Sequence, residues 1–164
     1  MAKAARTHVL PDAHALVSGE HRNRRPTLLW IDDFEPALAL YKATMERLGF
    51  KVLTASNGAE GVQLFLLNRV DLVITDYEMP ELKGDAVARM LKAINSKVPV
   101  IMFSGSTGLA RQSRRWIVAF CDKAGSRTEL LNKIDQLLGR KGPDRLQPAP
   151  IVTPSQSEPQ RTVA

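Results

Sequence analysis

The segment LVITDYEMP, residues 72–80, joins an apolar run to a carboxylate and a turn. Its first four residues are apolar or β-branched, which is typical of a short buried strand. Asp76 closes this run, and Pro80 turns the chain four residues later. Three further apolar runs also end in polar residues: Leu28–Ile31 in Asp32 and Asp33, Val100–Phe103 in Ser104, and Ile117–Cys121 in Asp122 and Lys123. This recurrence indicates that polar groups are collected where strands end.

Apolar runs alternate with segments of helical period between Thr27 and Gly139. Such alternation is typical of strand–helix units built around a parallel sheet. We therefore predict an α/β fold: a flavodoxin-like, doubly wound sheet of five parallel strands in the order 2-1-3-4-5, with helices on both faces. Because the carboxyl ends of parallel strands share one edge, the polar residues should lie along one rim.

This strand order places the strand of Asp76 between those of Asp33 and Ser104, roughly 4.8 Å from each. The strand of Lys123 lies two places away, about 9.6 Å, a gap that a lysine side chain can cross. Asp76 is therefore predicted to lie at the centre of the site.

Helices are predicted from the signals at their ends. One should begin near Pro36, which suits a first helical turn, and a second should follow a turn at residues 57–58. The last helix should begin with a capping box formed by Ser126 and Glu129 and end at Gly139.

Two segments before the last helix differ in how regularly their apolar residues are spaced. Residues 85–94 show helical spacing that predicts burial of Val87, Met90, Leu91 and Ile94. Residues 105–115 have few apolar positions, and we predict a short, poorly anchored helix there.

Charge is distributed unevenly along the 164 residues. The net charges are +3 for residues 1–26, +1 for 27–139 and +2 for 140–164, within a total of +6. We predict a flexible basic N-terminal extension (1–26), one folded domain (27–139) and a disordered Pro-rich tail (140–164). A nearly neutral domain makes a nucleic-acid partner unlikely. With one Cys, no secretory signal and no span of roughly 20 apolar residues, we expect a cytoplasmic protein without membrane insertion.

Three crowded carboxylates repel one another and stay ionised at neutral pH only if a cation neutralises them. Oxygen ligands without His or Cys select a hard ion. Mg²⁺ fits best, because it binds through one or two carboxylates, keeps waters and accepts phosphate oxygens. The rim is thus predicted to be a phosphorylation site with a carboxylate nucleophile, a metal ion and an ammonium group.

The segment from Thr27 to Gly139 resembles the receiver domain of two-component response regulators. The family pattern is an acidic pair, Asp-x-x-Met-Pro, a Gly four residues after that Pro, a Ser or Thr, and a Lys. The matching positions here are Asp32 and Asp33, Asp76–Pro80, Gly84, Ser104 and Lys123. The 44-residue step from Asp32 to Asp76 also matches the family's usual spacing.

The resemblance implies that Asp76 accepts a phosphoryl group from a histidine kinase or a phosphotransfer protein. It further implies that Mg²⁺ is bound directly by Asp33, Asp76 and the main-chain carbonyl of Glu78, and through water by Asp32. Only Mg²⁺-dependent self-phosphorylation and slow autodephosphorylation are expected, not enzymatic turnover of other substrates.

The same resemblance assigns a switch. Ser104 would be the switch hydroxyl, Lys123 would pair with the phosphoryl group, and Phe120 would be the switch aromatic. We expect a stand-alone receiver that signals through protein contacts, since residues 140–164 are too few and too polar to fold alone.

The sequence departs from the family pattern in three ways. Ala124 replaces the usual Pro after the site lysine, and a cis bond before Ala costs about 3 to 4 kcal/mol, so we predict a trans or strained bond. The 19-residue step from Ser104 to Lys123 is short and predicts a truncated or rewound fourth helix. Glu78 adds a carboxylate near the acceptor that is hypothesised to tune phosphoryl lifetime.

Two other function classes remain open. The alternative is a nucleic-acid-associated regulator that uses its basic tails under receiver control, although no helix-turn-helix or aromatic RNA-binding motif is present. An Asp-nucleophile phosphatase is disfavoured, because no second Asp stands two residues after Asp76.

Overall fold

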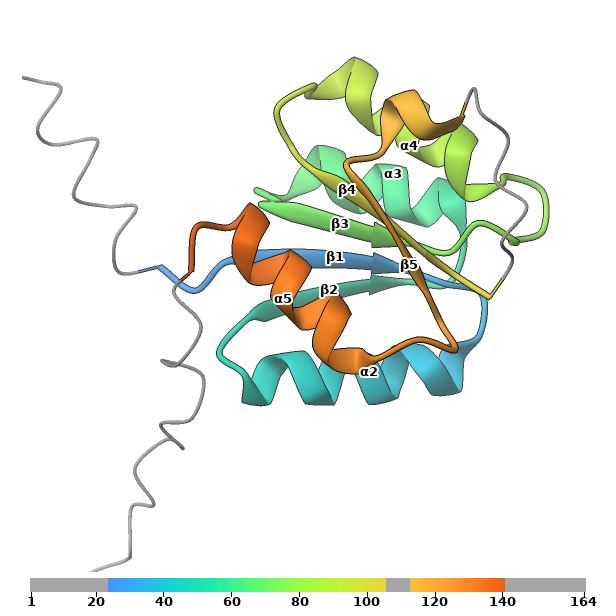
Figure 1. Ribbon diagram of the computed structural model, residues 1–164. Helices are drawn as coiled ribbons and strands as arrows, with labels where there is room; N and C mark the ends of the chain where they lie inside the picture. Colours follow the sequence, from blue (N-terminus) through green and yellow to red (C-terminus); the bar gives the residue numbers. More distant parts are fainter. Residues whose placement is uncertain (1–23, 106–112, 141–164) are drawn as a thin grey trace, which may run out of the picture.

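The computed structural model describes residues 24–105 and 113–140 of the chain. Its elements are, in order, β1 (Thr27–Ile31), α2 (Glu35–Arg47), β2 (Lys51–Ala55), α3 (Gly58–Leu67), β3 (Leu72–Thr75), α4 (Gly84–Ile94), β4 (Val100–Ser104), the 3₁₀ turn η1 (Ser113–Trp116), β5 (Ala119–Asp122) and α5 (Arg127–Leu137). The strands pair in parallel in the order β2-β1-β3-β4-β5 (Figure 1). The predicted fold class and strand order are confirmed.

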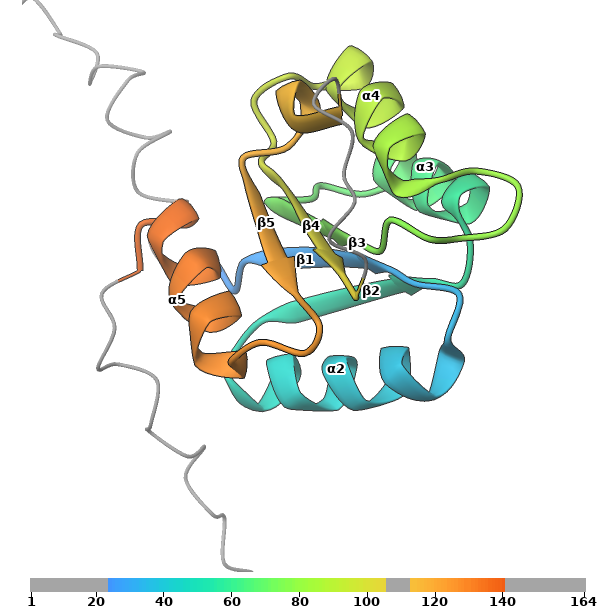
Figure 2. The same cartoon turned by 45° about the vertical axis from the view of Figure 1, so that its right-hand side comes forward.

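Helices cover both faces of this sheet. Figures 1 and 2 show α2 and α5 on one side and α3 and α4 on the other. Alternate residues of β1 point to opposite sides: Leu28 and Trp30 join the core under α2 and α5, whereas Leu29 and Ile31 join the core under α3 and α4. All five residues of β1 are buried, so this interior strand carries no charged side chain before Asp32, which directly follows it.

The buried face of α4 differs from the prediction. Val87 and Leu91 are buried as expected, but Met90 and Ile94 are 40% and 44% exposed. The buried face includes Ala88 instead, so it is rotated toward that residue and leaves Met90 on the flank. Ile94 is the last residue of the helix.

The predicted capping box at α5 is wrong in its detail. The Ser126 hydroxyl accepts a hydrogen bond from the Thr128 amide at 3.2 Å, one residue earlier than a capping box requires. A box-like cap occurs at α3, where Asn57 accepts from the Glu60 amide at 2.9 Å. The Glu60 carboxylate in turn accepts from the Ser56 amide at 2.8 Å. The predicted turn at residues 57–58 is therefore a helix N-cap.

Several predictions fall outside the described part of the chain. These include the N-terminal extension apart from residues 24–26, the tail after residue 140, and residues 106–112 of the predicted fourth helix. The described end of that segment is the single 3₁₀ turn η1, which is tied to α4 by a 2.7 Å hydrogen bond from the Ser113 hydroxyl to Asp85. Among the described residues, no helix is long and apolar enough to cross a bilayer.

Candidate functional site

The carboxyl ends of β1 and β3 bring three carboxylates together. Ligand oxygens of Asp32, Asp33 and Asp76 all lie within 4.8 Å of one another. Asp32 is fully buried and Asp76 is 6% exposed, whereas Asp33 is exposed to solvent. The backbone fixes the spacing, because the Asp76 amide donates to the Ile31 carbonyl at 2.8 Å. The cluster therefore has two buried members and one that faces solvent.

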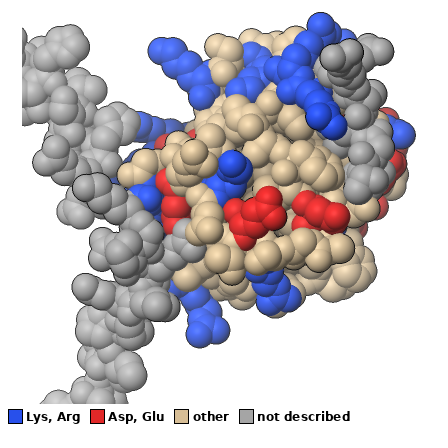
Figure 3. All heavy atoms as spheres, viewed as in Figure 1, with Lys and Arg blue, Asp and Glu red and all other residues tan. Residues whose placement is uncertain are grey.

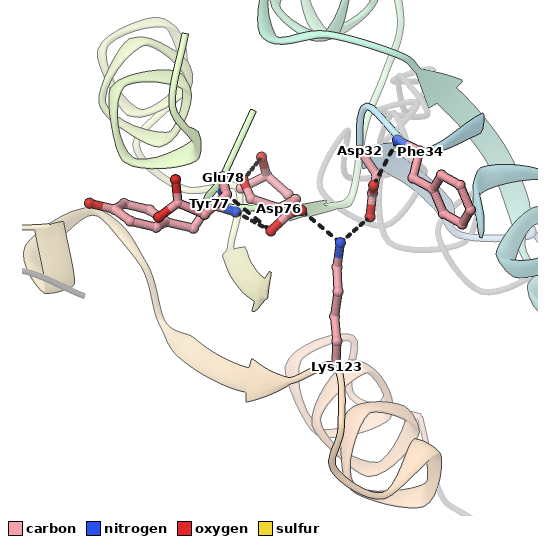
Figure 4. A network of polar contacts seen from close by, with 7 residues as sticks. Asp32, Phe34, Asp76, Tyr77, Glu78 and Lys123 are labelled. Atoms are coloured by element: carbon pink, nitrogen blue, oxygen red, sulfur yellow. Dashed lines mark hydrogen bonds and ion pairs between the residues drawn. The ribbon is translucent and has the colours of Figure 1, made fainter. Parts of the chain in front are cut away.

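Lys123 reaches this cluster from the end of β5, two strands away from β3 (Figure 4). Its Nζ donates to Asp76 Oδ2 at 2.6 Å and lies 2.7 Å from Asp32 Oδ2. Asp32 Oδ2 is buried, so the contact with Lys123 offsets the charge of a carboxylate that is shielded from solvent. One ammonium group thus neutralises part of the charge of two buried carboxylates.

Two opposing effects act on the pKa of Lys123, and the effect of the neighbouring carboxylates is the larger. Desolvation alone would lower the pKa of the ammonium group, whereas its contacts with Asp32 and Asp76 raise the pKa above the ordinary value. Lys123 is consequently a fixed cation at neutral pH.

Each oxygen of the Asp76 carboxylate has its own partner. Oδ1 accepts from the Tyr77 amide at 2.6 Å and faces the Glu78 amide at 3.4 Å, and Oδ2 accepts from Lys123 (Figure 4). These bonds come from two backbone amides and one lysine, so the carboxylate is held at both ends. Asp32 is similarly oriented by the Phe34 amide, which donates to its Oδ1 at 3.1 Å.

The predicted switch residues lie on the neighbouring strands. Ser104 ends β4 and is 1% exposed, and its carbonyl accepts from the Lys123 amide at 3.1 Å. Phe120 is half-buried in β5 and lies opposite Met102. Ser104 therefore shares the rim with the cluster, and its carbonyl fixes the start of the loop that carries Lys123.

The loop after β5 contains Ala124, which stands where the family usually has a Pro. No peptide bond among the described residues is cis, so the bond from Lys123 to Ala124 is trans, as predicted. The Ala124 amide donates to the Asp122 carboxylate at 2.8 Å, and the Gly125 amide donates to the Asp122 carbonyl at 3.0 Å. A tight turn closed by Asp122 thus occupies the place of the usual Lys–Pro corner.

A family model described as "Response regulator receiver domain" matches residues 28–135. The chain belongs to this family. The match covers the sheet from the second residue of β1 into α5, including every residue of the site just described.

Curated relatives of this receiver include regulators and a sensor kinase. The transcriptional regulatory protein PrrA of Mycobacterium tuberculosis is 32% identical over 124 residues, which cover 71% of this chain and 52% of PrrA. The autoinducer 1 sensor kinase/phosphatase LuxN of Vibrio harveyi is 35% identical over 86 residues, which cover 52% of this chain and 10% of LuxN. The chain thus spans about half or less of the length of these relatives.

Solved structures agree with this assignment. A response regulator receiver domain protein from Clostridium thermocellum is 30% identical, with a TM-score of 0.65 over 70% of this chain and 94% of its own. Response regulator protein TrrA from Thermotoga maritima, solved in complex with Mg²⁺–BeF, is 26% identical, with a TM-score of 0.65 over 68% of this chain and 98% of its own.

The acidic cluster of the receiver fits a magnesium ion. Its donors are all carboxylate oxygens, the donor class that Mg²⁺ prefers. The exposed Asp33 leaves a side open for the waters that Mg²⁺ retains.

The Glu78 side chain has an ion-pair partner other than the acidic cluster. Its carboxylate is exposed and pairs with Lys83 at 3.7 Å, while its amide faces Asp76. The structure therefore gives this side chain a partner outside the acidic cluster, and its hypothesised effect on phosphoryl lifetime stays a prediction.

Tyr41 adjoins the site, although no motif in the sequence pointed to it. Its ring stacks on Trp30 with centroids 4.3 Å apart, and Phe103 meets both rings edge-on. Burial raises the pKa of the Tyr41 hydroxyl, and the charges of Lys123 and Asp32 act on it in opposite directions. The sequence shows an aromatic residue in each of three separate segments, but the hydrophobic periodicity of a segment does not show which rings make contact.

Proposed function

We propose that this receiver is the phosphoacceptor module of a two-component or phosphorelay system in the cytoplasm. The observation that carries the proposal is the position of Lys123 Nζ, within 2.7 Å of carboxylate oxygens of both Asp32 and Asp76. This arrangement supports acceptance of a phosphoryl group at Asp76, because it supplies a fixed cation beside a buried nucleophile.

The chemical step is transfer from the phosphohistidine of a histidine kinase or phosphotransfer protein. An oxygen of Asp76 forms a bond to phosphorus, the nitrogen–phosphorus bond breaks, and the imidazole nitrogen takes the bonding electrons and a proton. Lys123 offsets the negative charge that gathers on the phosphoryl oxygens. When bound by Asp33, Asp76 and the main-chain carbonyl of Glu78, with Asp32 acting through water, Mg²⁺ supplies further charge neutralisation.

Phosphorylation then changes the surface that a partner reads. It adds about −1.5 to −2 charges at a buried rim, enough to bias a two-state element. In this proposal Ser104, whose carbonyl accepts from the Lys123 amide, moves toward the phosphoryl group, and Phe120 follows it. The output is a protein contact, and the alternative role in nucleic-acid association is not favoured, because the family match lies on the receiver alone.

A phosphoryl analogue tests the proposal without a kinase. Mg²⁺ with beryllofluoride should raise the melting temperature of the full chain, since ligand at 100 times its Kd stabilises by about 2.7 kcal/mol. Asp33→Asn should remove most of this rise, because it deletes the solvent-facing metal ligand. Glu129→Gln, a matched loss of one exposed carboxylate in the first turn of α5, should keep the full rise. An unchanged melting temperature in the wild-type chain would contradict the proposal.

A further inference from the structure

A second charged site lies at the amino ends of the strands, at the opposite edge of the sheet from Asp76. A cavity of about 640 Å³ is lined there by four cationic side chains, one carboxylate and an aromatic ring: Arg24, Arg25, Lys51, Arg69, Glu46 and Phe50. Figure 3, in the view of Figure 1, shows Lys and Arg side chains together with acidic ones on this left-hand side of the domain. The phosphoacceptor chemistry makes no use of these residues.

The sheet topology explains why the cations converge. Arg24 and Arg25 precede β1, Lys51 begins β2, and Arg69 lies just before β3. These three strands are neighbours in the sheet, and adjacent strands are about 4.8 Å apart. Backbone hydrogen bonds align their starts: the Lys51 amide donates to the Pro26 carbonyl at 2.9 Å, and the Asp71 amide donates to the Thr27 carbonyl at 2.9 Å. The cations are thus gathered by the backbone rather than scattered over a surface.

One of these cations is held rigidly. Arg24 donates two hydrogen bonds to the Asp71 carboxylate, at 2.6 and 2.8 Å, and a third to the Thr27 hydroxyl at 3.3 Å. Asp71 is fixed in turn by the Thr27 amide at 2.6 Å. Arg24 is paired with Asp71 and Arg69 has an interaction of its own, which leaves Arg25 and Lys51 in the lining against the single carboxylate of Glu46. The cavity therefore has an excess of positive charge.

The Phe50 ring also contacts a guanidinium group outside the cavity lining, that of Arg140, whose Nε lies 3.9 Å from the buried Asp135 carboxylate. The Arg140 guanidinium lies 4.2 Å over the Phe50 ring and donates to the Leu48 carbonyl at 3.3 Å. Its Nη1 is buried and has no hydrogen-bond partner within the described part of the chain. Phe50 itself is only 3% exposed, so its ring has little surface on which a nucleobase could stack.

We propose that this cavity binds a small ligand with a phosphate chain, such as inorganic tripolyphosphate or the triphosphate of a nucleotide. Guanidinium groups match phosphate oxygens in paired hydrogen bonds, and most of the cations here are arginines. The volume lies in the range of roughly 300 to 1,000 Å³ that is usual for small-molecule sites. A nucleic-acid strand fits less well, because single strands bind through exposed aromatic platforms and the Phe50 ring is only 3% exposed.

Titration calorimetry on the full chain tests this inference, with EDTA present so that a metal-loaded acidic cluster takes no part. Sodium tripolyphosphate should bind the wild-type chain at constant ionic strength. The double variant Arg25→Gln/Lys51→Gln should weaken binding about tenfold, equivalent to roughly 1.4 kcal/mol. The control Arg89→Gln/Lys97→Gln removes two exposed charges outside the cavity lining and should change Kd less than about twofold.

Parallel titrations identify the source of the phosphate. Equal affinity for tripolyphosphate and a nucleoside triphosphate supports a site for the chain of phosphates alone, and tighter binding of the nucleotide supports one that also contacts the base. Three results would overturn the inference: no binding by the wild-type chain, equal weakening in both double variants, or stronger binding of a short duplex DNA than of tripolyphosphate. Circular dichroism of both variants ensures that the comparison is between folded proteins.

Discussion

Gly84→Ala should lower the free energy of unfolding by about 3 kcal/mol or more. A Cβ atom on Gly84 would overlap the Asp76 carbonyl oxygen and lie 2.9 Å from its carbonyl carbon. It would also lie 3.1 Å from the Met102 sulfur. Since two of these atoms belong to the backbone of the acceptor residue, they cannot rotate away as a flexible side chain does. The loop from β3 to α4 must move, and Asp76 with it.

Urea unfolding of the wild-type and variant chains measures this loss. Gly105→Ala is the matched control, because a Cβ there meets no heavy atom of the described structure within 4 Å, although Gly105 directly follows Ser104. We expect the control to unfold within about 0.5 kcal/mol of the wild-type chain. Equal stability of the two alanine variants would show that the close approach of α4 to the acceptor loop is wrong.

Lys123→Met should destabilise the metal-free receiver by about 2 kcal/mol and make its stability depend on Mg²⁺. The substitution leaves the buried carboxylates of Asp32 and Asp76 without their ammonium partner. Loss of one partner from a fully buried pair costs about 3 to 5 kcal/mol, and a smaller figure applies because the Lys123 side chain is 27% exposed. A divalent cation can replace the missing charge, so Mg²⁺ should restore most of the loss.

Unfolding in EDTA and in Mg²⁺ separates this effect from a general loss of charge. Lys97→Met removes an exposed lysine and should match the wild-type chain in both conditions. The pH dependence has a definite sign: the raised pKa of Lys123 means that its contribution is complete at neutral pH and is lost only as the pH rises through that pKa. This alkaline loss should be absent from Lys123→Met. A variant as stable as the wild-type chain in EDTA would contradict the ion-pair geometry.

The strand ends were predictable because the short apolar runs and the helical spacing of the segments between them indicate the same fold. The runs before Asp32, Asp76 and Ser104 are short and apolar, and the segments between them have helical spacing, so a parallel sheet with crossover helices accommodates both. Strand order then follows from the doubly wound architecture and brings Lys123 into reach of Asp76. These features depend on local pattern and on general rules of connection.

Details that depend on tertiary contacts were not predictable in the same way. Met90 and Ile94 have the spacing of buried residues, but the rotation of α4 depends on which small residue, here Ala88, faces the sheet. The stacking of Tyr41 on Trp30 joins α2 to β1, and no sequence period encodes that contact. The orientation of the Glu78 carboxylate toward Lys83 likewise depends on the loop conformation.

Peptide mapping after phosphorylation tests the central claim most directly. The full chain is incubated with Mg²⁺ and acetyl phosphate, and mass spectrometry locates the residue that gains a phosphoryl group. We predict a gain confined to the peptide that carries Asp76, lost in Asp76→Asn and in the presence of EDTA. A gain on another peptide, an undiminished gain in Asp76→Asn, or no gain under conditions that label another receiver would contradict the account.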